Sequence, residues 1–181
     1  MDIQTISNLL LFVLLIALTA LFVGSEFSLV KVRTSRIDQL VSEGNSAAKI
    51  VQHMVHHLDY YLSACQLGIT VTALGLGWIG ESTFEALIHP VLHLFHIPTD
   101  LSKPITIFLS FFIVTFIHVV IGELAPKSLA IQYAERMTLA FARPLYFFGI
   151  IMKPLIFAMN GTARLILRIF GVQPADHEQA M

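Results

Sequence analysis

The sequence has little charge and almost no cysteine, and both shortages restrict what the protein can be. Only 13% of its 181 residues are charged, whereas 56% are hydrophobic, and this balance excludes an ordinary soluble globular domain. The single cysteine, Cys65, excludes an intrachain disulfide and a zinc site built from several thiolates. A net charge of −1 with scattered basic residues gives no indication of nucleic-acid binding. We therefore interpret the chain as an integral membrane protein.

Three apolar runs are each long enough to cross a bilayer as a helix, which takes about 20 residues. They predict spans over residues 6–30, 60–79 and 104–124, the last with a proline in its first turn. The first run is not a cleaved signal peptide, because residues 1–4 lack positive charge and the run continues into a polar cluster. We expect an all-α membrane protein with three transmembrane helices.

Basic residues set the expected orientation of these spans. Lys31, Arg33 and Arg36 follow the first span, and basic residues accumulate on the cytoplasmic side of membranes. The outer connection over residues 81–103 is instead mostly acidic, with Lys103 as its cation. We therefore expect a multi-pass protein of the plasma membrane with its N-terminus outside.

Two further segments are predicted to lie on the cytoplasmic face. Residues 34–57 show apolar positions at helical spacing, interrupted at Gly44-Asn45, which predicts a pair of short helices. Residues 128–170 predict a kinked juxtamembrane belt helix. The alternative is a fourth span over 144–163, but it would place basic residues outside and Lys153 near the middle of the bilayer. Residues 171–181 then begin a cytoplasmic linker.

Two groups of histidines were considered as metal sites. The first group, which lies in the cytoplasmic helix pair, is interpreted as a polar face at the membrane surface; it consists of His53, His56 and His57. The second group shares one helical face in the outer connection and offers a surface zinc site as an alternative, although Pro90 and Pro98 interrupt that segment. It consists of His89, His93 and His96.

Residues 119–127 place a carboxylate and a proline at the end of the third apolar run, where both are costly in a bilayer. Pro126 has no N–H, so we predict a helix break at Pro126-Lys127 that frees the Gly122 carbonyl beside Glu123. His118 lies five residues before Glu123, off its face in an α-helix, and is interpreted as a hydrogen-bonded structural histidine.

Polar residues of all three spans are expected at one depth in the inner half of the membrane. At 1.5 Å per residue, Ser25 lies ~9 Å above Lys31 and Glu123 lies ~6 Å above Lys127. The convergence would supply side-chain and carbonyl oxygens from Ser25, Ser28, Gln66 or Thr70, Gly122 and Glu123. Glu26 projects about 100° away from Ser25. It is a secondary candidate for gating, for carrying a proton or for pairing with Lys127, and Gln66 is likewise secondary.

The chemistry of this set favours a hard cation. It consists of oxygens with one or two carboxylates and has no thiolate, which suits Mg²⁺ or Na⁺ better than Zn²⁺. One carboxylate among neutral oxygens predicts weak binding. A transporter needs weak binding, because an ion held too tightly cannot leave.

Three motifs carry a resemblance to a known family. They are Gly24-Ser25-Glu26-Phe27-Ser28, then Gln66-Leu67-Gly68-Ile69-Thr70, then Gly122-Glu123-Leu124-Ala125-Pro126-Lys127. Over most of residues 1–170 the chain resembles the membrane domain of the CorC/cyclin M family, often called hemolysin-like. The resemblance implies a homodimeric Mg²⁺ transporter, coupled to Na⁺ for export, with three membrane helices per protomer and a belt. Its ion site would use Ser25, Ser28, the Gly68–Thr70 region, Gly122 and Glu123.

The sequence departs from the family pattern in two ways. Family members continue into nucleotide-binding CBS modules, which the resemblance places after this chain in a full-length protein. Ile69-Thr70 stands where many magnesium-transporting relatives have asparagines, and some relatives resemble exporters of small organic cations. Diamine export is therefore a second hypothesis, and a membrane scaffold or sensor that does not transport is a third. An enzyme is not expected, because no nucleophile–base pair or phosphate loop stands out.

Overall fold

The computed structural model describes residues 3–94 and 98–171, apart from the side chains of residues 93, 99 and 100. These residues are helical almost throughout and include no strand. The segments in chain order are α1 (Ile3–Lys31), α2 (Thr34–Ser42), α3 (Ser46–His56), α4 (Leu58–Leu94), α5 (Thr99–Ile117), η1 (His118–Leu124), α6 (Ala125–Gln132), α7 (Ala134–Ile151) and α8 (Lys153–Ile169).

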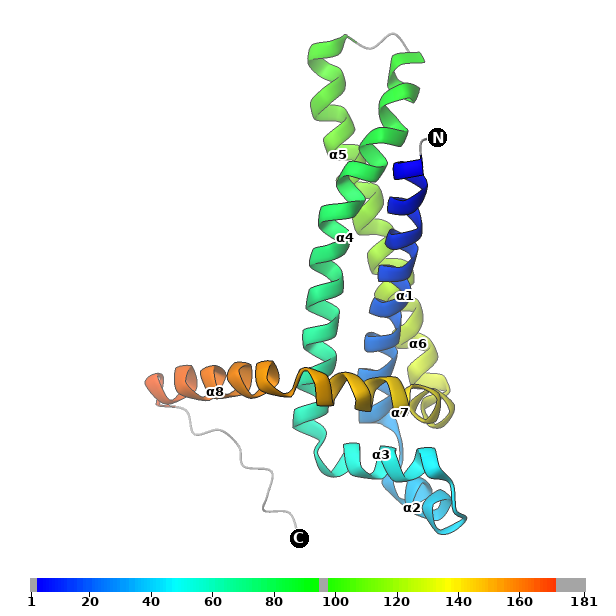
Figure 1. Ribbon diagram of the computed structural model, residues 1–181, viewed down its shortest axis with the longest axis vertical. Coiled ribbons are helices and arrows are strands. Elements are labelled where there is room, and N and C mark those ends of the chain that lie inside the picture. The colour runs from blue at the N-terminus through cyan, green and yellow to red at the C-terminus, as the bar shows by residue number, and fades with distance from the viewer. Residues whose placement is uncertain (1–2, 95–97, 172–181) are drawn as a thin grey trace.

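Three stretches are long and apolar enough to cross a membrane: Ile3–Lys31, Leu58–Leu92 and Leu101–Gln132. The third stretch joins α5, η1 and α6 into one helical rod. Figure 1 shows the three rods side by side in an upright bundle, with α2 and α3 at one end. The predicted all-α membrane fold with three spans is confirmed.

The second and third rods extend further than predicted. The outer connection expected over 81–103 is mostly helical, because α4 continues through Pro90 to Leu94 and α5 begins at Thr99. Pro104 therefore lies inside α5 and not in its first turn. Of the histidines considered for zinc in this segment, His96 and the side chain of His93 lie outside the described residues.

Gly80, one residue beyond the predicted end of the second span, is a contact point between rods. A Cβ at Gly80 would lie 2.8 Å from Val114 Cγ2 of α5 and 3.1 Å from the Phe12 ring of α1. The missing side chain thus lets three helices meet closely, which is a common use of glycine in membrane bundles. Gly80 is therefore a packing residue inside a continuing helix.

The helix pair predicted over residues 34–57 forms as α2 and α3 and packs against α7. Gly44 has a φ of +86°, a left-handed conformation that glycine adopts without strain. The Asn45 side chain then caps α3 by accepting hydrogen bonds from the N–H groups of Ala47 and Ala48. Buried side chains join this pair to α1, α4 and α7, and they include Ile37, Val51, Met54, Tyr61 and Leu145.

The belt begins at α7 because α6 continues the third rod through Gln132, six residues beyond Pro126 and past the predicted start at residue 128. Helices α7 and α8 are bent by 75° relative to each other, and α8 begins with Lys153-Pro154. α7 crosses the bundle near its α3 end, and α8 extends sideways away from the bundle (Figure 1). This course fits a belt better than a straight span over 144–163. An Arg36–Glu135 ion pair of 3.2 Å ties α2 to the start of α7.

Gly68 offers a direct test of the contact between α1 and α4. A Cβ at Gly68 would lie 2.6 Å from the buried Phe22 ring, whereas a Cβ at Gly77 would meet nothing within 4 Å. Gly68→Ala is expected to destabilise the chain by about 1–3 kcal/mol through overpacking, and Gly77→Ala to be neutral or slightly stabilising through helix propensity. Thermal unfolding of both variants in detergent checks this; equal melting temperatures would contradict the contact.

Candidate ion site

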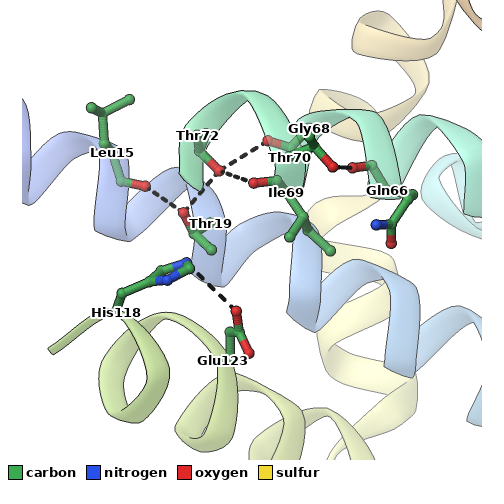
Figure 2. A network of polar contacts seen from close by, with 9 residues as sticks. All are labelled: Leu15, Thr19, Gln66, Gly68, Ile69, Thr70, Thr72, His118 and Glu123. Carbon is green, nitrogen blue, oxygen red and sulfur yellow. Dashed lines mark hydrogen bonds and ion pairs between the residues drawn. The ribbon is translucent and has the colours of Figure 1, made fainter. Parts of the chain in front are cut away.

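The third rod changes its hydrogen-bond spacing at the predicted site. Residues His118–Leu124 form a π-helix, in which the N–H of Ala125 donates to the carbonyl of Val120, five residues earlier. Such turns are rare and occur frequently at functional sites. The sequence-based prediction assumed α-helical spacing, which puts His118 and Glu123 on different faces of the helix. In the π-helix His118 Nε2 instead lies 3.6 Å from Glu123 Oε1, as Figure 2 shows.

The predicted break at Pro126-Lys127 is replaced by a continuous helix. Leu124 and Ala125 keep right-handed helical dihedrals, with φ/ψ of −66°/−45° and −65°/−50°. Pro126 has no N–H, so it cannot pair with Gly122 at α-helical spacing or with Ile121 at π-helical spacing. The proline therefore coincides with the change from π to α spacing, and the chain passes it without an interruption.

His118 is poorly satisfied where it lies. Its side chain is 17% exposed, against 43% for Glu123, and its Nε2 is a buried atom without a hydrogen-bond partner in the described part of the chain. A buried polar atom without a partner costs free energy. The hydrogen-bonded structural histidine predicted from sequence is thus not found. Instead, a buried imidazole nitrogen faces a carboxylate at slightly more than hydrogen-bond distance.

Two buried threonine hydroxyls, one on α1 and one on α4, lie near Gly122. The Oγ1 of Thr19 lies 2.8 Å from the Oγ1 of Thr72, which joins α1 to α4. Thr72 in turn donates to the Gly68 or Ile69 carbonyl, at 2.9 and 3.0 Å. A Cβ at Gly122 would lie 3.5 Å from the Thr19 methyl group, so the π-helix backbone lies against Thr19. Figure 2 shows Thr19 between Thr72 and the His118–Glu123 pair.

Sequence reasoning did not single out Thr19. It is a lone hydroxyl in an apolar run, and its spacing from the buried Phe12 and Ile16 puts it on the inner face of α1. That spacing was the available signal. Thr72 is one of several polar residues of the second span, and nothing in the sequence distinguishes it from Thr70.

The predicted oxygens differ in their exposure. Ser25 and Ser28 are buried, and their hydroxyls donate within α1 to the carbonyls of Leu21 (2.7 Å) and Ser25 (3.2 Å). Gln66 and Thr70 are exposed, and the Thr70 hydroxyl donates to the Gln66 carbonyl at 2.8 Å. Ser25 and Ser28 are therefore inside the bundle, while Thr70 and Gln66 lie on its surface in this structure.

The remaining predicted residues line the contacts between α1 and the third rod. Gly122 and Pro126 are buried and Glu26 is partly buried. Lys127 lies over the Phe27 ring, with Nζ 4.5 Å from the ring centroid, a favourable cation–π arrangement. Lys127 is also close enough to Glu26 for their charges to interact, as the sequence suggested.

A cavity of about 190 Å³ adjoins His118 between α4 and α5. Its polar lining residues are Glu81, Thr115 and His118. His118 thus borders this cavity and also faces Glu123. In the described residues no group of three or more His, Cys, Asp and Glu side chains is placed to hold a metal ion. A cation at Glu123 would consequently depend on neutral oxygens for most of its ligands.

Comparison with known proteins decides the family. Residues 10–181 match the family described as the cyclin M transmembrane N-terminal domain. The chain belongs to this family. Relatives include the UPF0053 proteins YrkA and YhdP of Bacillus subtilis (strain 168), which are 53% and 51% identical over 98% and 96% of this chain. A UPF0053 protein of Mycobacterium tuberculosis is 32% identical over 96% of this chain.

The matches cover only part of those relatives. This cyclin M domain spans 41% of YrkA, 39% of YhdP and 38% of the mycobacterial protein. The chain therefore spans about two-fifths of the length of the curated relatives it matches. The family resemblance inferred from the three motifs is confirmed.

The hydroxyl pair gives a test that separates buried from exposed threonines of α4. Thr72→Val removes the partner of Thr19 without changing side-chain shape, whereas Thr70→Val removes an exposed hydroxyl that bonds only its own helix. We expect Thr72→Val to destabilise the chain by about 0.5–1.5 kcal/mol, and Thr70→Val to have no such effect. Melting temperatures in detergent measure the difference, and the reverse order would refute the pairing.

Proposed function

We propose that this cyclin M domain transports Mg²⁺ across the plasma membrane, with Glu123 as the charged ligand of the ion. The supporting observation is the π-helix, which holds a partly exposed carboxylate beside a buried imidazole and against the hydroxyl-bearing core of α1 and α4. Membership of the cyclin M family supports the same function. Neutral oxygens would complete the shell, as expected for a hard cation that must also be released.

The ligand set that we propose combines the predicted oxygens with those that the geometry adds. Ser25, Ser28 and the Gly122 carbonyl remain candidates on α1 and η1, and Thr19 and Thr72 join them. Gly68 and Thr70 would contribute only after a rearrangement, because Gly68 packs on Phe22 and Thr70 is exposed. Glu26 stays a secondary candidate, within the influence of the Lys127 charge.

The proposal also covers the direction of transport and the assembly of the protein. We propose that the domain exports Mg²⁺ in exchange for Na⁺ as the coupling ion. The working unit is a homodimer, and the N-terminus lies outside. In a full-length protein, nucleotide-binding CBS modules would follow the belt and regulate the membrane domain. These parts rest on the family resemblance and on the position of the basic residues Lys31, Arg33 and Arg36.

The decisive variant is Glu123→Gln, which keeps the side-chain size and removes the charge. A ligand that binds the folded state raises its stability, so Mg²⁺ should raise the melting temperature of the wild type and not that of Glu123→Gln. Mg²⁺ flux into liposomes should fall at least about tenfold, the effect of losing roughly 1.4 kcal/mol of ion binding. Glu85→Gln, at the outer end of α4, is the matched control and should behave as wild type.

The same titration with Ca²⁺, Na⁺ and putrescine distinguishes the alternatives. Stabilisation by putrescine but not by Mg²⁺ would replace the proposal with diamine export. Wild-type flux in Glu123→Gln would remove Glu123 from the site. No ion-specific stabilisation and no flux in the wild type would favour a scaffold that does not transport.

His118 gives a second test, based on a substitution. Its Nε2 lies 3.6 Å from Glu123 Oε1 and is a buried atom without a hydrogen-bond partner in the described part of the chain. His118→Gln replaces the imidazole beside the proposed ligand carboxylate, so it should change the affinity for Mg²⁺, measured by titration of the melting temperature. A Mg²⁺ affinity equal to that of the wild type would show that His118 does not influence an ion at Glu123.

A further inference from the structure

A second cavity, larger than the one beside His118, lies at the junction of α3, α4, α7 and α8. Its volume is about 480 Å³. It lies beside the bend between α7 and α8, which is 75°, and its lining includes residues of both helices. None of the residues proposed for the ion site lines it.

One face of α8 makes this cavity electropositive. Lys153, Asn160 and Arg164 all line it, at spacings of seven and four residues, which keep side chains on one helical face. No Asp or Glu lines the cavity. Within the described residues, neither Lys153 nor Arg164 forms an ion pair. Their contacts are a long Arg164 Nε bond of 3.3 Å to the Asn160 carbonyl and a Lys153 Nζ 5.9 Å from the Phe157 ring centroid.

The opposite wall adds two imidazoles. The rings of His53 and His57 lie 4.4 Å apart, and the His57 Nδ1 lies 2.9 Å from the His53 carbonyl. Burial, and then the charges of His57 and His56, lower the pKa of His53. Part of this lowering of the His53 pKa comes from repulsion between positively charged imidazoles. An anion in the cavity would relieve it and could accept hydrogen bonds from the imidazoles.

Aromatic side chains give the cavity its apolar wall. Tyr60 is held in place by a 2.6 Å hydrogen bond from its hydroxyl to the Gly149 carbonyl, and the Phe157 ring lies 6.1 Å away. Tyr61 and Tyr146 stack behind them. Tyrosines and cations together are typical of protein surfaces at the level of lipid headgroups.

The surface of α8 around this cavity is apolar and uncovered. Of the described residues of α8, only Ile156 is buried, whereas Leu165, Ile166, Ile169 and Phe170 are exposed. A helix with an uncovered apolar face and a basic polar face lies in the membrane interface. The cationic cavity therefore opens beside the part of the chain that contacts lipid.

We propose that this cavity binds the phosphate group of an anionic phospholipid. Lys153 and Arg164 contact the phosphate oxygens, Asn160 and the histidines donate further hydrogen bonds, and the acyl chains leave along the apolar surface of α8. The ligand is a lipid because aromatic and apolar surface surrounds the cations. A free phosphate ion would satisfy the same cations, and the experiment separates the two sources.

The test uses the purified chain in a neutral detergent, with short-chain phosphatidylglycerol as the probe and phosphatidylcholine of the same chain length as the reference. Binding is followed by native mass spectrometry and by the melting temperature. Phosphatidylglycerol should bind at least about fivefold more tightly than phosphatidylcholine. Each charge-assisted contact with the phosphate contributes at least about fivefold, so Lys153→Gln with Arg164→Gln should lose about thirtyfold in affinity for phosphatidylglycerol.

The matched control is Arg168→Gln. Arg168 is an exposed cation of the same helix, one turn beyond Arg164, and does not line the cavity. Its removal should change the affinity by less than about twofold. Equal losses in Arg168→Gln and in the double variant would overturn the proposal, because they would indicate attraction to the whole basic helix. Equal binding of the two lipids would also overturn it.

Two further arms keep the result decisive. Inorganic phosphate that stabilises the chain through Lys153 and Arg164, with no extra effect of phosphatidylglycerol, would reject the lipid and assign the cavity to a soluble anion. If the double variant does not fold, Lys153→Gln is compared with Arg168→Gln on the same criteria. Stabilisation by Mg²⁺ in the double variant shows that this site and the ion site are independent.

Discussion

The hydrogen bonding of the third rod is the constraint on which the candidate site depends. Within a bilayer each backbone N–H and C=O must find a partner inside the helix, because lipid offers none. Pro126 removes one donor from this rod, and the rod pairs across five residues immediately before it. The wider turn rotates Glu123 relative to an α-helix and brings His118 beside it. The relative position of the Glu123 and His118 side chains is thus a consequence of the backbone hydrogen bonds.

The sequence predicted the fold well because the fold follows from simple physical signals. Apolar runs of sufficient length predicted the three spans, and Gly44-Asn45 predicted the turn between α2 and α3. Basic residues and Lys153-Pro154 argued for a belt. The errors lay at prolines. Pro90 and Pro104 were read as boundaries, but a proline in a long membrane helix is compatible with a continuing helix.

The site was only partly accessible from sequence. Gly122 lies against Thr19 of α1, which fits the expected convergence of the spans. Glu123 drew attention because a carboxylate in an apolar run is rarely there without a role, and its part in an ion site stays a prediction. The pairing of His118 with Glu123 could not be derived, because its spacing of five residues has meaning only in a π-helix. Thr19 and Thr72 were missed for a different reason. Their importance comes from facing each other across two helices, which depends on the register between α1 and α4 and not on either sequence alone.

The glycines of α4 have a mechanical consequence. Gly68, Gly75 and Gly80 lie against Phe22, Leu15 and Phe12 of α1 in turn, so the two helices interlock along most of their shared length. Sliding or tilting one against the other would drive each ring or branched side chain into a backbone, which makes α1 and α4 a single stiff body. The third rod packs on this body at two levels, with Val114 beside Gly80 and with Gly122 beside the Thr19 methyl group. The contact at Gly122 lies at the level where the hydrogen-bond spacing of the rod changes.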